Sequence, residues 1–300
     1  MNKSKPKALV IVGPTASGKS DLAVRLAKRL NGEVISADSR QVYKGLNIGT
    51  GKITKAEMKG VKHHLLDVVE PSKQFTVTQY QDLATKALED IVSRGKLPII
   101  CGGTGFYIDT VTHRAHFPDV SPNKLLRKKL NKLKAEELFK ILTKKDPARA
   151  KSIDPHNKLR LIRALEIVES LGKVPQPTAN YLLPTAEFIY LGLKPKDLDK
   201  RIKKRLLKRI PGIVREAKKL SPKRAHELGL EYRFAMLYIK GKLTRAKFVE
   251  GLNTAINQYA KRQTTWFKRN KEITWHESAQ SAYESALKQV GGAKRPRSRK

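Results

Sequence analysis

Gly13-Pro14-Thr15-Ala16-Ser17-Gly18-Lys19-Ser20 is the stretch that decides the fold, because it matches G-x-x-x-x-G-K-[ST], the pattern of a phosphate-binding loop. The apolar run before it, residues 8–12, is typical of a buried strand. Leucines at positions 22, 26 and 30 indicate an amphipathic helix over residues 21–30. Strand, loop and helix in this order predict an α/β fold with a parallel sheet, like that of the P-loop NTPases.

The loop also has the residue types that hold a di- or triphosphate. Gly13 and Gly18 permit backbone angles closed to other residues, so successive N–H groups can point at one anion. The N-terminus of the following helix adds partial positive charge. Lys19 supplies a full charge to the terminal phosphate, and the Ser20 hydroxyl can ligate Mg²⁺. The loop does not tell which phosphate compound binds.

The composition is that of a soluble globular protein in a reducing compartment. The chain has 300 residues, 39% of them hydrophobic, enough to bury the core of one or two domains. No apolar run approaches the roughly 20 residues of a membrane span, and residues 1–7 do not form a cleavable signal. The single cysteine, Cys101, excludes a disulfide framework and a cysteine-rich metal site. We expect a cytoplasmic monomer without a membrane segment.

The charge is far from balance: 63 Lys and Arg against 27 Asp and Glu give +36. The densest basic clusters lie between residue 124 and the end of the chain. Such a charge can serve solubility alone, but on a phosphate-binding fold it favours a polyanionic partner, a nucleic acid. Residues 291–300 are half basic with no apolar period, which predicts a disordered tail that acts as an electrostatic arm.

Further strands and loops predict where the other site residues lie. Residues 33–38 are a second strand ending in Asp38, which should face the same crevice as the phosphate loop, because ligands sit at the carboxyl ends of parallel strands. Residues 39–52 indicate a long active-site loop. His63 and His64 are adjacent and point different ways on any regular element, which favours hydrogen-bonded structural histidines over a metal pair.

A third strand, residues 97–101, follows a helix expected over residues 78–94. It ends in Gly102 and Gly103, which predict close approach of the backbone to a ligand or a simple tight turn, and Thr104 offers a hydroxyl at the same place. Residues 188–193 are a returning strand, and the chain after them is mainly helical.

The sequence pattern changes between residues 117 and 177, where short, charged helical patterns replace the strand patterns. One helix, residues 159–168, places Arg160 and Arg163 side by side, which requires an anion or a carboxylate such as Glu166. We therefore predict a P-loop-like core with C-terminal helices (1–116 and 178–290), a helical insertion (117–177) and the tail (291–300). In the C-terminal part, residues 261–268 combine aromatic and basic side chains suited to RNA.

Together these segments resemble the bacterial tRNA dimethylallyltransferase family, also called tRNA isopentenyltransferase. The matching segments occur in the family's order: residues 13–20, 37–45 with 48–50, 63–67, 102–107, 160–166 and 261–266. The first segment alone is common to many nucleotide enzymes, whereas the set is specific.

The resemblance implies transfer of a dimethylallyl group from dimethylallyl diphosphate to the exocyclic N6 amine of the adenosine 3′-adjacent to the tRNA anticodon, with Mg²⁺. By position, Lys19, Asp38 and Thr104 match the catalytic residues, Asp38 being the general base, and the insertion matches a tRNA-binding lid. The diphosphate-binding residues are Gly13, Pro14, Thr15, Ala16, Ser17, Gly18, Lys19 and Ser20, with Ser20 the metal ligand. The tRNA-contacting residues are Asp38, Ser39, Arg40, Gln41, Thr104, Arg127, Leu159, Arg160, Leu161, Ile162, Arg163, Arg233, Lys261, Arg262, Gln263, Thr264, Thr265, Trp266, Phe267 and Lys268.

Three positions depart from the family pattern: Glu231, Asn257 and Leu159 stand where glycine, arginine and a polar residue are usual. None of them alters Lys19 or Asp38. Two other functions stay open, a small-molecule kinase that uses the same loop and a non-catalytic RNA-binding factor. The kinase would not need the +36 charge, and the intact Gly18-Lys19-Ser20 disfavours a loop without activity.

Overall fold

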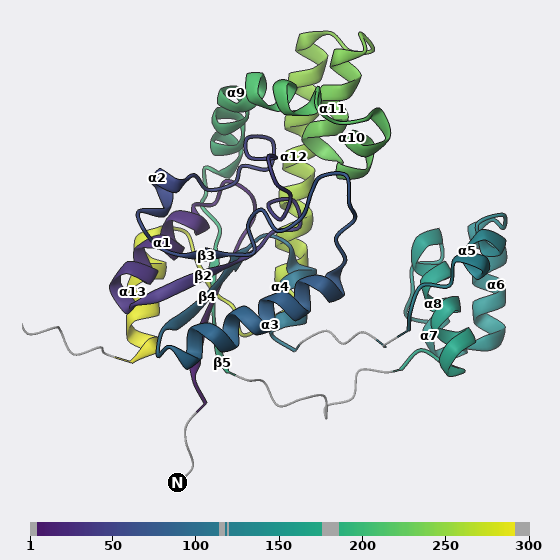
Figure 1. The fold of residues 1–300 in the computed structure, drawn as a ribbon, viewed down its shortest axis with the longest axis horizontal. Helices are drawn as coiled ribbons and strands as arrows, with labels where there is room; N and C mark the ends of the chain where they lie inside the picture. Colours follow the sequence, from purple (N-terminus) through teal and green to yellow (C-terminus); the bar gives the residue numbers. More distant parts are fainter. Residues whose placement is uncertain (1–4, 114–117, 119, 176–185, 292–300) are drawn as a thin grey trace, which may run out of the picture. The chain divides into compact units, whose positions relative to one another are not determined.

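The computed structural model describes residues 5–113, 118, 120–175 and 186–291. The predicted tail from residue 292 and the predicted domain boundaries at 116–117 and 177–178 lie outside these residues. The chain divides into two compact units, one of residues 1–114 with 184–300 and the other of residues 115–183. We call them the core unit and the insertion. Figure 1 shows the helices and strands of each.

The core unit is built on a six-stranded parallel sheet in the order β3-β2-β4-β1-β5-β6. The strands are β1 Lys7–Val12, β2 Gly32–Ala37, β3 His63–His64, β4 Leu97–Gly102, β5 Glu187–Leu193 and β6 Thr274–His276. The predicted parallel sheet is confirmed, but β3 and β6 were not predicted, and β6 interrupts the C-terminal region expected to be helical. Both strands are too short to produce a periodic apolar pattern.

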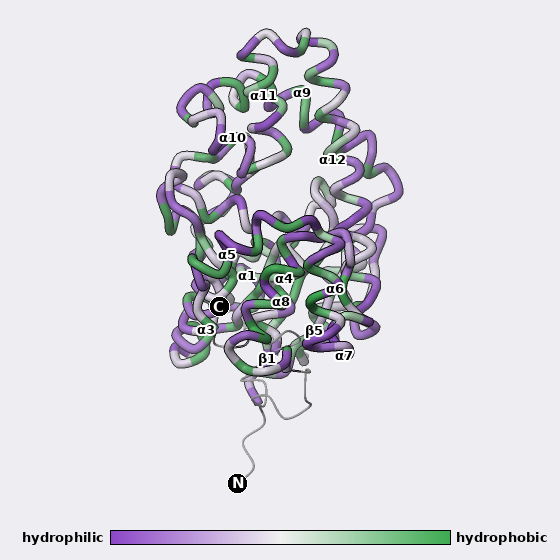
Figure 2. Tube along the Cα trace, turned by 90° about the vertical axis from the view of Figure 1, so that its right-hand side faces the viewer, coloured by the Kyte–Doolittle hydropathy of each residue, from purple (hydrophilic) through white to green (hydrophobic). Residues whose placement is uncertain are grey.

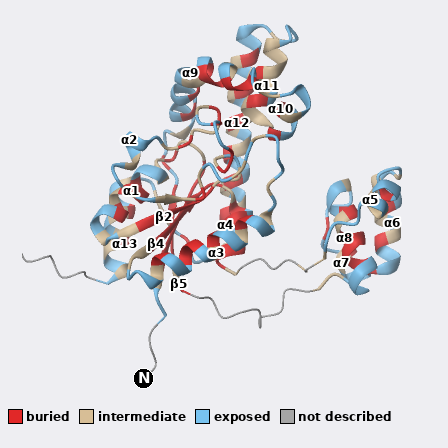
Figure 3. Cartoon of the chain, viewed as in Figure 1, coloured by how far each residue is buried: buried red, intermediate tan, exposed pale blue. Residues whose placement is uncertain are grey.

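Helices cover both faces of the sheet, and β1 is therefore buried on both sides (Figure 3, buried residues in red). Leu9 and Ile11 pack with α1 (Lys19–Leu30) and α13 (Ala279–Val290). Val10 and Val12 belong to the opposite cluster, together with residues of α3 (Val77–Ser93) and α4 (Gly105–Val111). Alternation of the side chains along a strand thus fixes two hydrophobic layers around one sheet. Figure 2 shows hydrophobic residues along these segments.

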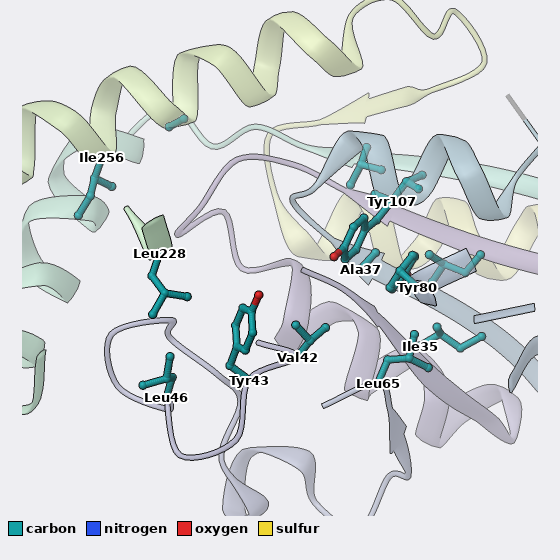
Figure 4. Close-up of a cluster of buried hydrophobic side chains, with 14 of the residues drawn as sticks. Ile35, Ala37, Val42, Tyr43, Leu46, Leu65, Tyr80, Tyr107, Leu228 and Ile256 are labelled. Carbon is teal, nitrogen blue, oxygen red and sulfur yellow. The ribbon is translucent and has the colours of Figure 1, made fainter. Parts of the chain in front are cut away.

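The remaining helices of the core unit follow β5 and pack against one another: α9 Leu198–Ala217, α10 Pro222–Leu228, α11 Leu230–Ile239 and α12 Arg245–Phe267. A short helix, α2 Lys55–Met58, lies in the segment between β2 and β3. Residues 39–54 before it contain no helix or strand of the sheet, as expected for a long loop. Val42, Tyr43 and Leu46 of this loop are buried in the same cluster as Leu228, so the loop is anchored by its own apolar residues (Figure 4).

Two stacked aromatic rings pack near the carboxyl end of β2, and one of them is hydrogen-bonded to it. The rings of Tyr80 and Tyr107 are stacked, with their centroids 3.8 Å apart; Figure 4 shows the two side chains. The Tyr80 hydroxyl donates a hydrogen bond to the Ser36 carbonyl at 3.2 Å. A buried hydroxyl that finds a partner stabilises its surroundings, and this one fixes the strand two residues before Asp38.

The insertion has a hydrophobic core of its own, to which Leu138, Leu142, Leu161 and Leu165 contribute. Its helices are α5 Lys124–Leu130, α6 Ala135–Lys145, α7 Pro147–Ala150 and α8 Lys158–Leu171. The predicted apolar stripe of Leu161, Leu165 and Val168 is buried. Within the residues that the structure describes, no helix of either unit is long and apolar enough to cross a membrane.

Candidate active site

The phosphate-binding loop joins β1 to α1 and has the conformation that its glycines allow. Gly13 has φ 153°, and a Cβ added there would lie 2.5 Å from the Leu193 carbonyl oxygen of β5. Gly18 is left-handed, with φ 94°, and forms the N-cap of α1. The Ser17 hydroxyl is buried and has no hydrogen-bond partner among the described residues. The loop therefore leaves a polar side chain as well as the start of a twelve-residue helix to meet an anion.

Lys19 lies at the start of α1, with its ammonium over the loop, where Nζ donates to the Pro14 carbonyl at 3.1 Å. Burial lowers the pKa of Lys19; nearby Asp38 raises it and nearby Arg205 lowers it further. A cation whose charge is disfavoured by burial gains from a bound anion. The three charged side chains therefore share one electrostatic environment.

Asp38 and Thr104 follow neighbouring strands, β2 and β4, whose pairing puts Ala37 opposite Gly102. Asp38 Oδ1 accepts a hydrogen bond from the Arg40 N–H at 2.9 Å. Thr104 Oγ1 accepts one from the Ser39 N–H at 3.0 Å. The pairing of β2 with β4 brings the residues that follow the two strands together, so the half-buried Asp38 and Thr104 lie at the same edge of the sheet.

Gly102, the last residue of β4, and Gly103 after it serve the packing of the protein itself. A Cβ at Gly102 would lie 2.0 Å from the Ala37 carbonyl oxygen, and one at Gly103 would lie 2.2 Å from Gln263 Nε2. The close approach expected for a ligand is thus an approach to the neighbouring strand and to α12. Gly102 in addition lines the pocket described next.

A pocket of about 360 Å³ opens where these elements meet. The residues that line it come from the phosphate loop, the ends of β2 and β4, the long loop, the end of α10, and the helices α9, α11 and α12. They are Thr15, Lys19, Ser20, Asp38, Ser39, Arg40, Gln41, Gly49, Thr50, Gly51, Cys101, Gly102, Arg205, Leu228, Gly229, Leu230, Glu231, Tyr232, Ile256, Tyr259, Arg262 and Gln263. One pocket therefore holds the predicted phosphate loop, Asp38 and part of the predicted RNA-contacting set.

Arg205 of α9 and Tyr259 of α12 are pocket residues that the sequence reasoning missed. Arg205 donates to the Gly51 carbonyl at 3.0 Å, and burial, followed by nearby Arg209, lowers its pKa. Burial also raises the pKa of Tyr259 to about 12, while a hydrogen bond with Thr104 acts in the opposite direction. Arg201, Arg205 and Arg209 recur every fourth residue, on one helix face, and this spacing could have singled them out from a mere charge cluster.

Glu231 brings a second carboxylate to the pocket, 3.6 Å from Arg209. Burial raises the pKa of Glu231, whereas Arg209 lowers it. Glu231 therefore adds an acidic group to the wall of the pocket, beside Arg209.

The segment 261–268 divides between packing and exposure. Gln263 Oε1 accepts from the Thr15 N–H at 2.9 Å, and its Nε2 donates to the Gly103 carbonyl at 2.8 Å. Phe267 is buried in the core, and Trp266 Nε1 donates to Asp109 at 2.9 Å. The side chains of Gln263 and Phe267 are thus buried and bind or pack within the core unit. The exposed side chains of the segment are those of Lys261, Arg262, Thr265 and Lys268.

In the insertion, two of the three predicted RNA-contacting arginines, Arg127 and Arg163, converge on Glu166, whose side chain is fully buried. Arg127 binds it with two hydrogen bonds of 2.6 and 2.7 Å, and Arg163 lies 3.4 Å away. Burial alone would raise the pKa of Glu166, but the hydrogen bonds from Arg127, the Asn123 N–H and Arg163 together outweigh it, and the pKa is lowered. The interpretation in which Glu166 neutralises Arg163 is therefore confirmed.

The neighbours of these arginines on α8 differ in exposure. Leu161 and Ile162 are buried in the core of the insertion, which makes their side chains unavailable for direct contact with RNA in this structure. Leu159 is 78% exposed, and Arg160 is exposed as well. Among residues 159–163, only the first two side chains and part of Arg163 are therefore accessible from outside the insertion.

His63 and His64 are hydrogen-bonded as predicted, to the Val61 carbonyl at 2.9 Å and to Glu33 at 2.7 Å. Glu33, His64 and Asp90 form a group that could hold a metal ion within the described part of the chain. However, Glu33 already binds the side chains of Arg94 and Lys96 at 2.6 to 2.8 Å. These cations occupy the carboxylate, so the group is an ion-pair network and lies apart from the pocket lining.

The fold and the pocket define a class, the P-loop-like α/β enzymes that act on a phosphorylated substrate. The family profile described as "IPP transferase" matches residues 41–270. The tRNA dimethylallyltransferase of Anoxybacillus flavithermus is 41% identical over 283 residues, covering 90% of this chain and 89% of the relative. That of Bacillus subtilis is 38% identical over 288 residues, covering 92% of each. The chain therefore belongs to the IPP transferase family, which confirms the resemblance drawn from its motifs.

Solved structures agree with this assignment. The full-length tRNA isopentenylpyrophosphate transferase from Bacillus halodurans has a TM-score of 0.70 and 36% identity, covering 95% of this chain and 97% of that one. A eukaryotic dimethylallyltransferase acting on tRNA has a TM-score of 0.80 and 28% identity, covering 95% of this chain and 77% of that one. The family thus accounts for nearly the whole chain.

Proposed function

We propose that this protein transfers a dimethylallyl group from dimethylallyl diphosphate to N6 of the adenosine 3′-adjacent to the anticodon in tRNAs. The N6–carbon bond forms, the carbon–oxygen bond to the diphosphate breaks, and one amine proton leaves; the products are N6-dimethylallyladenosine and diphosphate. The observation that carries the proposal is the pocket, in which the carboxylate of Asp38 and the phosphate loop with Lys19 lie together.

The phosphate end of the pocket would bind and stabilise the leaving diphosphate. The loop N–H groups, the buried Ser17 hydroxyl and the Lys19 ammonium all favour negative charge there, and Arg205 adds a second cation. The same loop can bind ATP in other enzymes; we propose that it holds diphosphate here. Charge that develops on the leaving group is what these donors stabilise, so they act on the transition state.

Mg²⁺ fits the oxygen donors at this end. The Ser20 hydroxyl is exposed and lines the pocket with the Asp38 carboxylate, and Mg²⁺ prefers hard oxygen ligands of this kind, with waters completing its shell. Ser20 would hold the ion directly. When bound, Mg²⁺ would neutralise part of the charge of the diphosphate.

The base end of the pocket would activate the adenine amine, which is a poor nucleophile. Asp38 accepts its proton as a general base, and Thr104, bound to the Ser39 N–H, keeps the segment after β2 in place. The adenine must leave its stack to enter the pocket. The exposed cations Arg40, Arg262 and Lys261 lie at or near its rim and would hold the RNA backbone. We propose that Arg160 and the other exposed cations of the insertion hold the anticodon stem-loop as well.

Mass spectrometry of tRNA nucleosides tests this function. Unmodified tRNA is incubated with the protein, Mg²⁺ and dimethylallyl diphosphate, with ATP in place of the prenyl donor as the control. We expect dimethylallyladenosine only with the prenyl donor, at the position following the anticodon. A protein that binds diphosphate but leaves every adenosine unmodified would contradict the proposal.

A further inference from the structure

Helix α9 holds one segment of the long loop, residues 47–51, by both of its polar edges. The Glu216 carboxylate accepts hydrogen bonds from three successive backbone N–H groups, those of Asn47, Ile48 and Gly49, at 2.9, 2.7 and 2.8 Å. The Tyr232 hydroxyl donates to the same carboxylate at 2.9 Å. Glu216 is 7% exposed. Charge-assisted hydrogen bonds in a buried place are among the stronger ones in a protein.

Arg209 binds the opposite edge of the same segment. Its Nε donates to the Ile48 carbonyl at 2.6 Å, and its Nη2 donates to the Gly49 carbonyl. Arg209 and Glu216 are seven residues apart, two turns of α9, and therefore lie on one face of the helix. The N–H groups of the segment thus donate to the carboxylate of Glu216, and the carbonyl groups of the segment accept from the guanidinium of Arg209.

The segment is packed against the helices as closely as its glycines allow. A Cβ at Gly49 would lie 2.5 Å from the Tyr232 ring, and one at Gly212 of α9 would lie 2.5 Å from the Ile48 side chain. Neither gap admits a side chain larger than hydrogen without movement. The close packing therefore leaves the segment one position against α9, and the hydrogen bonds to Glu216 fix that position.

The other side of this segment faces the pocket and orients two of its polar side chains. The Gly51 carbonyl accepts from Arg205 Nη2 at 3.0 Å and from Gln41 Nε2 at 3.4 Å. Gly49, Thr50 and Gly51 themselves line the pocket. A shift of the segment would move the carbonyl to which Arg205 is bound.

We propose that Glu216 is a positioning residue for the diphosphate end of the pocket: by fixing residues 47–51 it fixes the Gly51 carbonyl, and through it the guanidinium of Arg205. The proposal rests on the proposed function, in which Arg205 meets the diphosphate. Within the described residues, no hydrogen bond or ion pair joins Glu216 to Lys19 or Ser20 of the phosphate loop, so we expect its effect to pass through Arg205.

Titration with inorganic diphosphate, followed by calorimetry, tests this without requiring turnover. Glu216→Gln keeps the size of the side chain but loses the charge and presents an amide where N–H groups point. We expect the dissociation constant for diphosphate to rise about tenfold, the lower range for loss of a hydrogen bond to a charged group. The variant is made in the wild-type background and in an Arg205→Met background.

Glu33→Gln is the matched control, because Glu33 is also a buried carboxylate with several donors and lies outside the pocket. It should lower the melting temperature and change diphosphate affinity less than about twofold. In the Arg205→Met background, Glu216→Gln should cost less than about twofold as well, since the residue it positions is gone. Arg209→Met serves as the second variant, with the same expectation, if Glu216→Gln does not fold.

Two results would overturn the proposal: wild-type diphosphate affinity in a folded Glu216→Gln variant, or an undiminished tenfold cost in the Arg205→Met background. Turnover separates this outcome from failure of the proposed function. A protein that shows coupling between Glu216 and Arg205 in diphosphate binding, but does not prenylate tRNA, would contradict the function and leave the positioning role intact.

Discussion

The pocket of the core unit and the buried charge cluster of the insertion each contain a carboxylate, and the two carboxylates differ in how many hydrogen bonds they accept from the protein. In the insertion, Glu166 is fully buried and its oxygens are taken by Arg127, Arg163 and the Asn123 N–H. In the pocket, Asp38 is half-buried, and its one hydrogen bond among the described residues comes from the Arg40 N–H. A saturated carboxylate holds helices together, whereas an unsaturated one beside a phosphate loop remains available to a substrate.

The cations of the two regions differ in the same sense. Lys19 and Arg205 line one pocket with their charges close together, and Lys19 is half-buried with its pKa lowered by burial, so an anion bound there is held strongly. Arg160 and other basic residues of the insertion are exposed, where single contacts with phosphate are weak and screened by salt. The comparison predicts that chemistry is lost by mutating the pocket and that RNA affinity is reduced gradually by mutating the insertion.

The largest effect is expected for Lys19→Ala. Because Lys19 would meet the leaving diphosphate, we expect turnover to fall by at least about 10³-fold, the upper range for loss of one donor to a developing charge. Binding of tRNA, measured by filter retention, should change less than about threefold. An equal loss of tRNA affinity would break the division between the two regions.

A smaller effect is expected for Arg160→Gln on α8. Loss of one phosphate contact should weaken tRNA binding several-fold and reduce the slope of log affinity against log salt by about 0.7–0.9, with saturated turnover unchanged. Arg29→Gln, an exposed arginine at the far end of α1, is the control and should leave the slope as it is. An unchanged slope in Arg160→Gln would show that this arginine does not meet the RNA.

The smallest effect on function is expected for Glu33→Gln, which should destabilise the core unit by roughly 1–3 kcal/mol without changing turnover at 25 °C. Hydrogen bonds from Arg94, and also from Lys96 and His64, hold the pKa of Glu33 well below the ordinary glutamate value of 4.5. A depressed pKa adds stability above pH 4.5 that is lost as the pH falls toward the folded pKa. The stability difference between wild type and variant should therefore be largest near neutral pH and shrink below about pH 4.5. Urea unfolding across this range measures it.

Much of the fold could be predicted, because the longer strands are recognisable in the sequence as apolar runs. The phosphate-binding loop is recognisable as a glycine motif. The strands β3 and β6 could not, since they have two and three residues and owe their conformation to β2 and β5, which they pair with. Intrinsic preference does not decide segments of that length; the neighbouring strand does.

The site divides in a similar way. Lys19 and Asp38 follow from a motif and from the rule that ligands meet strand ends. Arg205 and Glu216 act on a loop more than 150 residues earlier in the chain, and only the folded packing of α9 brings them there. Gln263 was expected to contact RNA, but its amide binds the Thr15 N–H and the Gly103 carbonyl, a use that a local sequence pattern does not reveal.

Single-turnover kinetics of Asp38→Asn, with tRNA prebound and dimethylallyl diphosphate added in excess, test the central claim most directly. The substitution keeps the size of the side chain and the bond from the Arg40 N–H but removes the base. We predict that the chemical step slows by about 10²–10⁴-fold while the affinities for both substrates change little, because the lost interaction exists only in the transition state. A near-normal chemical step accompanied by weaker diphosphate binding or a lower melting temperature would contradict the assignment of Asp38 as the general base.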